Sequence, residues 1–448
     1  INLFRVHIMK GNFYSLILYP LYHALKRDGF NKAVRVALSN EALADQELMR
    51  LQQKKLQSIL RHAIDAIPYY KSFKAYDNSA ELKLSDFPVI DKKVITENFE
   101  DFQWPEAAEE ELLDNSTSGS SGISFKFKTD IASQAARMAY KFINHSWLGI
   151  SRSDRKVWLW GAGLDLSSSQ TIRGKVRSWV TGEVYLDSGD LSDQQLEKYY
   201  HFIRKFSPAL ITSYPGPMYE FALFCQKNKY TLPSLRAIIS SAEMLYPYQR
   251  ELIESVFLIR VANRYGSREF GDMALEDHTQ QGMRINAGRV FIEVLDEELC
   301  PCAYGEEGDI VVTDLDNFGM PMIRYRLGDR GILLKNKSNQ SPRLASVTGR
   351  SMDVIKMANG KKVGGTFWTL LMRKKPGIRQ FQMRQVSPNK LIVYYSKDEQ
   401  FSEGLLEYLN SKIQLQLGGD VDVQFELLAS FPLPANGKHR IIINETPS

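Results

Sequence analysis

The sequence is poor in cysteine and lacks a long uninterrupted apolar run. Its 448 residues contain three cysteines, Cys225, Cys300 and Cys302, too few to cross-link a secreted fold of this size, so reduced thiols and a cytoplasmic location are favoured. Apolar residues near the start are interrupted by Pro20, His23 and several basic residues, and none of the runs approaches the ~20 residues of a membrane-spanning helix. The residue order of a signal peptide is also absent. We therefore expect no transmembrane segment.

A strong excess of one charge is missing as well. Lysine and arginine number 57 and aspartate and glutamate 52, for a net charge of +5. This excess is too diffuse over the chain to argue for a nucleic-acid-binding protein, and it is compatible with a charged small substrate such as a nucleotide. Residues 1–30 carry an apolar stripe, for which a helix packed on its own domain is the favoured interpretation. Peripheral membrane contact through these residues is the alternative.

The apolar pattern predicts a mixed fold. Residues 41–65 carry apolar side chains at three- and four-residue intervals, as in an amphipathic helix that ends near Ile67. Farther along, short β-rich runs alternate with helical patterns, which indicates an α/β fold with parallel strands. The predicted strands are 156–160, 209–212, 237–240, 261–265 and 290–295.

The second half of the chain changes character. From residue 289 to 314 the pattern is strand, acidic turn, strand, which predicts an antiparallel, β-rich subregion. After Gly349-Arg350 the chain restarts as a compact α+β unit with predicted strands at 354–356, 391–395 and 421–427 and a helix at 401–417. Since the chain exceeds the size of one hydrophobic core, we expect a large N-terminal domain, 1–349, and a small C-terminal domain, 350–448.

Hydroxyl groups and glycines are unusually dense at residues 115–122. Backbone N–H and side-chain O–H groups in such a loop can converge on an anion, and phosphate is the obvious one. The segment lacks the Gly-Lys-Ser/Thr ending of a P-loop, and a flexible Ser-Gly linker is an equally good interpretation of it in isolation. The candidate phosphate-binding residues are Thr117, Ser118, Gly119, Ser120, Ser121 and Gly122.

Four further segments follow in the order found in the adenylate-forming superfamily of acyl- and aryl-CoA ligases. Residues 264–269 resemble its Tyr-Gly-x-x-Glu motif, and residues 323–329 resemble its Arg-Tyr-x-x-Gly-Asp motif. Residues 349–353 resemble the interdomain hinge, and 436–438 resemble the turn with the C-terminal catalytic lysine. The phosphate loop fits the same order. Within the superfamily the sequence is similar to phenylacetate-CoA ligases and to CapK-like proteins of capsular polysaccharide biosynthesis.

The resemblance implies an ATP-dependent, AMP-forming ligase whose catalytic residues are Lys438, Glu269 and Arg350. Joining a carboxylate to the α-phosphate of ATP brings two anions together, so catalysis consists mainly of charge neutralisation and positioning. Glu269 is implied to hold the magnesium ion, and Lys438 to reach the α-phosphate and carboxylate oxygens. Asp329 is implied to accept hydrogen bonds from the ribose hydroxyls. Arg350 is implied to lie near the nucleotide at the hinge, and the small domain is expected to be mobile.

Other implied contacts lie at the ends of predicted strands, where open α/β sheets bind ligands. A buried core tryptophan is an equally good interpretation of Trp160. The implied ATP or AMP contacts are Ser241, Ala242, Glu243, Tyr265, Gly266 and Ser267, and the implied acyl-pocket residues are Trp160, Gly161, Tyr214 and Pro215.

The acid and the acceptor stay open at this point. The leading hypothesis is acyl transfer from the adenylate to coenzyme A or another thiol or amine. The alternative is an amide or ester on a sugar in capsular or surface polysaccharide biosynthesis, and the two share the first half-reaction. A non-catalytic scaffold is disfavoured because Lys438, Glu269 and Asp329 are all present.

Zinc binding by Cys300, Cys302 and His278 is a weaker hypothesis. Thiolate and imidazole suit zinc, but the spacing is not Cys-x-x-Cys and a fourth ligand is not evident. Two plain thiols in a turn are the favoured interpretation.

Overall fold

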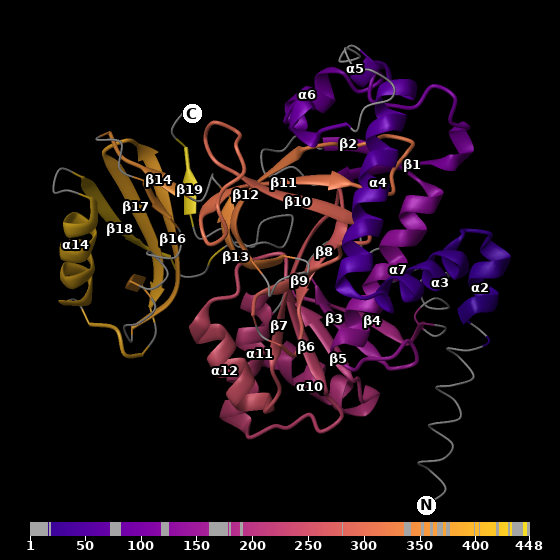
Figure 1. Ribbon diagram of the computed structural model, residues 1–448. Helices are drawn as coiled ribbons and strands as arrows, with labels where there is room; N and C mark the ends of the chain where they lie inside the picture. Colours follow the sequence, from indigo (N-terminus) through magenta and orange to yellow (C-terminus); the bar gives the residue numbers. More distant parts are fainter. Residues whose placement is uncertain are drawn as a thin grey trace, which may run out of the picture. The chain divides into compact units, whose positions relative to one another are not determined.

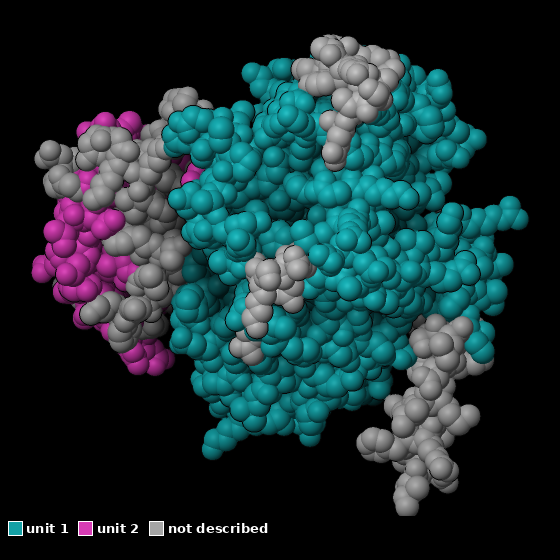
Figure 2. Space-filling view, in the orientation of Figure 1, with its two compact units in different colours: residues 1–327, 331–347 teal, residues 328–330, 348–448 magenta. Residues whose placement is uncertain are grey.

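The structure is a computed structural model that divides into two compact units. The first comprises residues 1–327 and 331–347, and the second comprises 328–330 and 348–448 (Figure 2). The residues that the structure describes are 17, 19–71, 82–117, 125–160, 178, 181–188, 191–279, 281–335, 342–350, 354–358, 362–364, 371–372, 377–397, 399–402, 404–417, 421–428, 431 and 442–445.

A mixed sheet forms the framework of the first unit, with the strand order β10-β11-β12-β13-β9-β8-β7-β6-β5-β3-β4 in the described residues (Figure 1). The neighbouring strands β4, β3, β5, β6 and β7 pair in parallel, in that order across the sheet. Parallel strands end at the same edge of a sheet, so the segments that follow them are neighbours. The parallel strands are β3 (Lys156–Trp160), β4 (Glu183–Asp187), β5 (Leu210–Ser213), β6 (Ala237–Ser241) and β7 (Val261–Ser267).

Helices cover both faces of these parallel strands. Successive side chains of a strand point to opposite faces. Ile238 accordingly packs with the crossover helices, whereas its neighbour Ile239 packs on the other face, toward the end of α7. The crossover helices are α10 (Asp193–Phe206), α11 (Pro215–Asn228) and α12 (Pro247–Phe257), and α7 is Ile131–Trp147.

The other half of the sheet is antiparallel wherever its pairing is described. β7 and β8 form a hairpin, and Val290 of β10 pairs with Asp314 of β11. This half packs on one face of α4, through side chains that include Leu56, Ile59 and Leu60. The elements are α4 (Asp45–Ala66), β8 (Gly271–Glu276), β9 (Met283–Ile285), β10 (Val290–Leu295), β11 (Glu307–Asp314), β12 (Tyr325–Leu334) and β13 (Arg343–Arg350).

A separate two-stranded hairpin precedes α7. Its strands β1 and β2 are antiparallel, and Thr117 is the partner of Phe125 at the end nearest the serine-glycine segment. Asp130 ends β2 and caps α7, because its carboxylate accepts a hydrogen bond of 2.6 Å from the amide of Ser133. The elements before α7 are α2 (Tyr19–Lys26), α3 (Phe30–Glu41), α5 (Pro68–Lys71), η2 (Leu84–Asp86), α6 (Lys92–Glu97), η3 (Glu109–Glu111), β1 (Leu112–Thr117) and β2 (Phe125–Asp130).

The N-terminal helices α2 and α3 pack on α7. Tyr19, Phe30 and Val34 share a buried cluster with Ala139 and Ile143. This packing agrees with the favoured interpretation of the N-terminal stripe for its described part. Within the described residues, no helix is both long and apolar enough to span a membrane.

The second unit is a small α+β fold. Its main sheet has the order β18-β17-β16-β19, and β14 pairs with β15. The helix α14 contributes Leu409 and Ile413 to a core shared with Met383, Leu391 and Val393 of the sheet. The elements are β14 (Val354–Lys356), β15 (Lys362–Gly364), β16 (Ile378–Ser387), β17 (Lys390–Lys397), α14 (Gly404–Leu417), β18 (Asp422–Leu427) and β19 (Ile442–Asn444).

The predicted mixed α/β fold is confirmed. Residues 156–160 and 290–295 form strands with the predicted bounds, whereas the helix predicted at 41–65 begins only at Asp45, because α3 runs to Glu41. The assignment of 1–349 and 350–448 as functional domains stays a prediction.

Candidate active site

Glu269 lies in the tight turn between β7 and β8. Its side chain is buried, and the hydroxyl of Ser267 accepts a hydrogen bond of 3.2 Å from the amide of Phe270 across the turn. The register shifts between Tyr265 and Gly266, and a Cβ on Gly266 would lie 2.6 Å from the carbonyl oxygen of Gly271. Only glycine permits this close approach of the two strands. The turn therefore holds the backbone of Glu269 in a defined conformation.

Two side chains from elsewhere in the sequence contact the Glu269 carboxylate, and the ring of Phe125 lies beside both of them. The hydroxyl of Tyr325, at the start of β12, donates to its Oε1 at 3.4 Å, and Lys92 Nζ lies 3.8 Å from the same oxygen. The ring of Phe125, the first residue of β2, stacks on Tyr325 with a centroid distance of 6.1 Å. Lys92 Nζ also lies 5.8 Å from the Phe125 centroid. The Tyr-Gly-x-x-Glu segment, the Arg-Tyr-x-x-Gly-Asp segment and one end of the serine-glycine segment are thus brought together.

Lys92 reaches this site because its segment is hydrogen-bonded to β12. Ile90 donates to the carbonyl of Arg324 at 3.0 Å and accepts from the amide of Arg326 at 2.8 Å. Asp91 then caps α6, because its carboxylate accepts hydrogen bonds from the backbone amides of Lys93 and Val94, each at 2.9 Å. Lys92 follows as the first residue of the helix. Sequence reasoning did not select it, and its only signal was a basic pair after a capping aspartate.

The serine-glycine segment is placed only through its ends. Thr117 is buried at the end of β1, opposite Phe125. Phe125 stacks on Tyr325, whose hydroxyl donates to the Glu269 carboxylate. The loop end of this hairpin therefore lies near that carboxylate. Ser118, Gly119, Ser120, Ser121 and Gly122 lie outside the described residues, so their role stays a prediction.

The end of β6 carries a strained backbone position. Ala242 has φ +69°, a left-handed conformation that costs energy for a residue with a Cβ. The preceding Ser241 is buried and accepts a hydrogen bond of 2.9 Å from Nε of Arg264, on the neighbouring strand. Glu243 follows, partly buried. Strain of this kind is often found at binding sites, and the arrangement is consistent with the nucleotide contact predicted for residues 241–243.

Tyr265 occupies a different environment from the neighbouring residues of its motif. Its ring is buried in the core that packs on α4, whereas Gly266, Ser267 and Glu269 form or flank the turn. A contact between the Tyr265 side chain and a nucleotide stays a prediction.

The predicted acyl-pocket residues lie together at the ends of adjacent parallel strands. Trp160 ends β3, Tyr214 follows β5, and their rings stack with a centroid distance of 4.2 Å and an interplanar angle of 21°. Pro215 begins α11, and Gly161 lies outside the described residues. Trp160 is partly exposed while Tyr214 is buried. The pair forms an aromatic wall at the sheet edge where ligands bind in such folds.

The remaining candidate residues are less completely placed. Asp329 lies on β12 after Tyr325 and is partly buried, but residues 328–330 group with the second unit. Arg350 ends β13 with its side chain outside the described residues, and Lys438 is outside them altogether. Their predicted roles are untested.

The carboxylate of Glu269 has the chemistry that a magnesium ion requires. Its contacts with described residues fall on Oε1, which leaves Oε2 available, and magnesium in nucleotide sites is usually held by one or two carboxylates plus phosphate oxygens. Among the described residues, no group of three or more His, Cys, Asp or Glu side chains is placed to hold a metal ion. Cys300, Cys302 and His278 belong to the described residues and form no such group, and none of the three cysteines forms a disulfide within that part of the chain.

Comparison with solved structures identifies the fold. The fold is that of the adenylate-forming ligases. The chain matches the crystal structure of a 2-hydroxyisobutyryl-CoA ligase in its postadenylation state with a TM-score of 0.69 and 17% sequence identity, over 90% of this chain and 89% of that one.

Comparison with curated sequences gives the particular relatives. The chain is 20% identical to protein CapK of Staphylococcus aureus over 411 residues, which are 89% of each chain. It is 26% identical to phenylacetate-coenzyme A ligase of Pseudomonas putida over 345 residues, which are 73% of this chain and 76% of the relative. Residues 355–445 match the model of the CapK C-terminal domain. The resemblance predicted from the sequence motifs is therefore confirmed.

Proposed function

We propose that this chain is an AMP-forming ligase that activates a carboxylic acid with ATP and then transfers the acyl group to coenzyme A or another acceptor. The observation that carries the proposal is the meeting of Phe125, Tyr325 and Lys92 around the Glu269 carboxylate. Glu269 and Tyr325 belong to the segments predicted to bind the magnesium ion and the ribose, Phe125 follows the predicted phosphate loop, and Lys92 is an addition from the structure.

The first half-reaction joins two anions. A carboxylate oxygen of the acid attacks the α-phosphorus of ATP, the bond from that phosphorus to the bridging oxygen breaks, and pyrophosphate leaves. Magnesium, when bound, neutralises phosphate charge during this displacement. Glu269 would hold the ion through a carboxylate that accepts a hydrogen bond from Tyr325, and the predicted role of Lys438 is to offset charge at the α-phosphate.

Lys92 is a further source of positive charge at the site. Its side chain is 42% exposed, so its ammonium group is accessible to a ligand from solution. The ammonium lies between the carboxylate and the ring that follows the serine-glycine segment. A lysine in this position attracts the phosphate chain as a point charge.

The second half-reaction needs an acceptor, and two classes are supported. The acceptor attacks the carbonyl carbon of the acyl-adenylate, loses a proton and expels AMP. The likeness to CoA ligases over most of the chain supports a thiol. The match of residues 355–445 to the CapK C-terminal domain and the likeness to protein CapK support the second candidate, an amine or hydroxyl of a sugar in surface polysaccharide assembly. A cytoplasmic location is part of the proposal.

Product analysis tests the proposed function. The purified chain is incubated with ATP, magnesium and a panel of aryl, fatty and amino acids, and AMP and acyl products are measured by mass spectrometry. We expect AMP to form only with particular acids. Coenzyme A dependence of product formation then separates the two acceptor classes. Formation of ADP in place of AMP would refute the proposal.

A further inference from the structure

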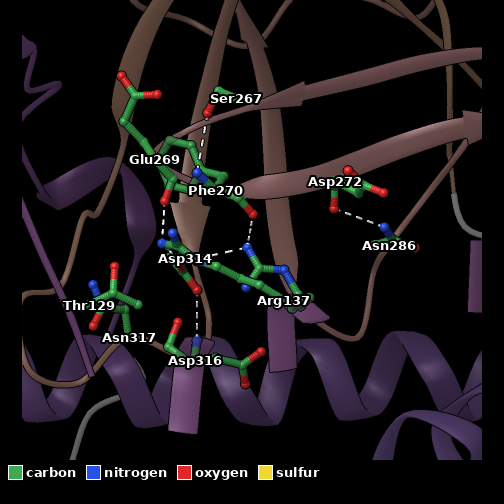
Figure 3. Close-up of polar contacts among 12 residues, drawn as sticks. Thr129, Arg137, Ser267, Glu269, Phe270, Asp272, Asn286, Asp314, Asp316 and Asn317 are labelled. Atoms are coloured by element: carbon green, nitrogen blue, oxygen red, sulfur yellow. Dashed lines mark hydrogen bonds and ion pairs between the residues drawn. The ribbon is translucent and has the colours of Figure 1, made fainter. Parts of the chain in front are cut away.

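A buried arginine on α7 holds the backbone of the Glu269 turn. The Arg137 side chain is 8% exposed. Its Nη2 donates to the carbonyl of Glu269, and its Nη1 donates to the carbonyl of Arg268 at 3.2 Å. The turn and its buried partners lie together in Figure 3. The methylene stem of Arg137 packs against Gly271, where a Cβ would lie 3.4 Å from its Cγ.

A second buried arginine holds the next carbonyl. Arg289 is fully buried, and its Nη2 donates to the carbonyl of Phe270. Both guanidinium groups share the carboxylate of Asp314, with Oδ2 at 3.5 Å from Arg137 Nη2 and 3.7 Å from Arg289 Nη2. Three successive carbonyls, those of residues 268, 269 and 270, are therefore held by two cations on one anion.

This arrangement is costly for stability alone. Taking two guanidinium groups and one carboxylate out of water carries a desolvation penalty that well-packed apolar side chains would avoid. Burial, opposed by the nearby Asp314, lowers the pKa of Arg137 to about 10. Because burying this network carries a large desolvation penalty, we attribute its presence to the backbone geometry that it fixes and not to a gain in stability. Here that geometry is the orientation of the backbone on both sides of the Glu269 side chain.

Arg137 also connects this turn to the hairpin of the serine-glycine segment. α7 begins directly after β2, and β2 begins at Phe125, opposite Thr117. The guanidinium lies 5.9 Å from the ring of Phe127 on β2. Arg137 thus contacts both β2, the strand after the predicted phosphate loop, and the turn that carries Glu269, the predicted magnesium ligand.

We propose that Arg137 is a positioning residue that fixes the Glu269 turn relative to the phosphate-loop hairpin and thereby sets the affinity for magnesium-bound ATP. This inference rests on the proposed function. Arg137 acts through the carbonyl groups of the turn and does not contact the reacting atoms. Its role depends on the forked shape of the guanidinium, which can donate to two carbonyls and approach a carboxylate at once, whereas a lysine ammonium is a single point charge.

The substitution Arg137→Lys separates geometry from charge. It keeps a cation beside Asp314 and removes the fork. We expect the magnesium concentration for half-maximal ATP binding to rise about tenfold, at the lower end of what outer partners of metal ligands contribute. Saturating magnesium should bring turnover back to within about twofold of wild type, because the ligand itself is unchanged.

Arg343→Lys is the matched control. Arg343 is similarly buried, and it donates to Asp277 Oδ1 at 2.6 Å and to the carbonyl of Gly282 at 3.1 Å. Among the described residues it makes no contact with the Glu269 turn. The substitution Arg343→Lys therefore removes a buried guanidinium group elsewhere in the first unit. We expect its magnesium requirement to equal that of wild type.

ATP binding is measured by calorimetry over a magnesium series for wild type and both variants. Wild type that binds no ATP at any magnesium concentration contradicts the proposed function itself. Wild type that binds ATP, with Arg137→Lys showing the same magnesium dependence, overturns only the inference, as does an equal shift in Arg343→Lys. If Arg137→Lys does not fold, Arg137→Gln is measured in the same way. It leaves Asp314 paired with Arg289 alone, and an unshifted magnesium requirement again overturns the inference.

Discussion

Replacing Gly266 with alanine tests how closely the two strands that carry the Glu269 turn must approach. The new Cβ would lie 2.6 Å from the carbonyl oxygen of Gly271 and 3.3 Å from Cα of Asp272. Both are backbone atoms of the paired strand, so no side chain can rotate away. The strands must separate by about half an ångström to reach ordinary contact, and overpacking of this kind costs about 1–3 kcal/mol.

The substitution is expected to lower activity as well as stability. Arg137 and Arg289 donate to the carbonyls of residues 268–270, so a shift of the strand at Gly271 strains these hydrogen bonds and displaces the Glu269 side chain. A misplacement approaching 1 Å at a catalytic group can cost about 10²-fold in rate. We therefore expect Gly266→Ala to lower the rate of acyl-adenylate formation by about 10- to 100-fold and Tm by about 1–4 °C.

The control for this substitution is Gly404→Ala, at the start of α14. A Cβ there meets no atom within 4 Å, so we expect Tm to change little, as for surface substitutions that cost less than about 0.5 kcal/mol. Adenylate formation is followed by stopped assays at saturating ATP, acid and magnesium, and Tm by differential scanning fluorimetry. Wild-type rate and Tm in Gly266→Ala would refute the close packing of this turn.

Three further predictions concern other parts of the chain. Asp329→Ala should raise the KM for ATP more than the KM for the acid, because ribose hydroxyls are bound in both ground and transition states; an unchanged KM for ATP removes Asp329 from the site. Met352→Pro, in a segment outside the described residues, fixes one φ near about −65° and should keep pyrophosphate exchange while slowing acyl transfer; equal slowing of both half-reactions contradicts a pivot there. Burial lowers the pKa of Lys156 from 10.5 to about 8, so between these values the folded state binds fewer protons than the unfolded state and stability rises with pH. Wild type should gain about 3 kcal/mol in unfolding free energy relative to Lys156→Met between neutral pH and pH 10.5, and a difference that does not change with pH contradicts the burial of a charged Lys156.

The parts of the site that follow single strands were predictable from the sequence. Trp160 and Tyr214 each follow a short β-rich run, and parallel pairing of β3 with β5 brings them into contact. Glu269 belongs to a recognisable motif. In each of these cases the local sequence carries the information, because strand ends and tight turns have characteristic residues.

Lys92 and Arg137 could not be found in this way. Lys92 joins the site through the bridge between Ile90 and Tyr325, residues far apart in the sequence. Arg137 is one of several polar residues on an amphipathic helix, and its burial becomes evident only when α7 packs against the turn after β7. Such roles depend on tertiary packing, which periodicity does not report.

The strands that sequence reasoning did not identify have polar residues along them. β1 is largely exposed, and its central residues Asp114, Asn115 and Ser116 are polar. β16 carries Gln385 on its buried face, next to the less buried Arg384. Alternation of apolar and polar residues is weakened in both, so neither stood out against loop or helix patterns.

The central claim, formation of an acyl-adenylate, is tested most directly by ATP–pyrophosphate exchange. Wild type and Lys438→Ala are assayed in parallel over a panel of carboxylic acids, with folding and ATP binding checked for both. The account predicts exchange that depends on a particular acid in wild type and that falls by about 10²- to 10³-fold in the variant, because a transition-state charge contact is lost. A folded wild-type chain that binds ATP and shows no exchange with any acid would contradict it.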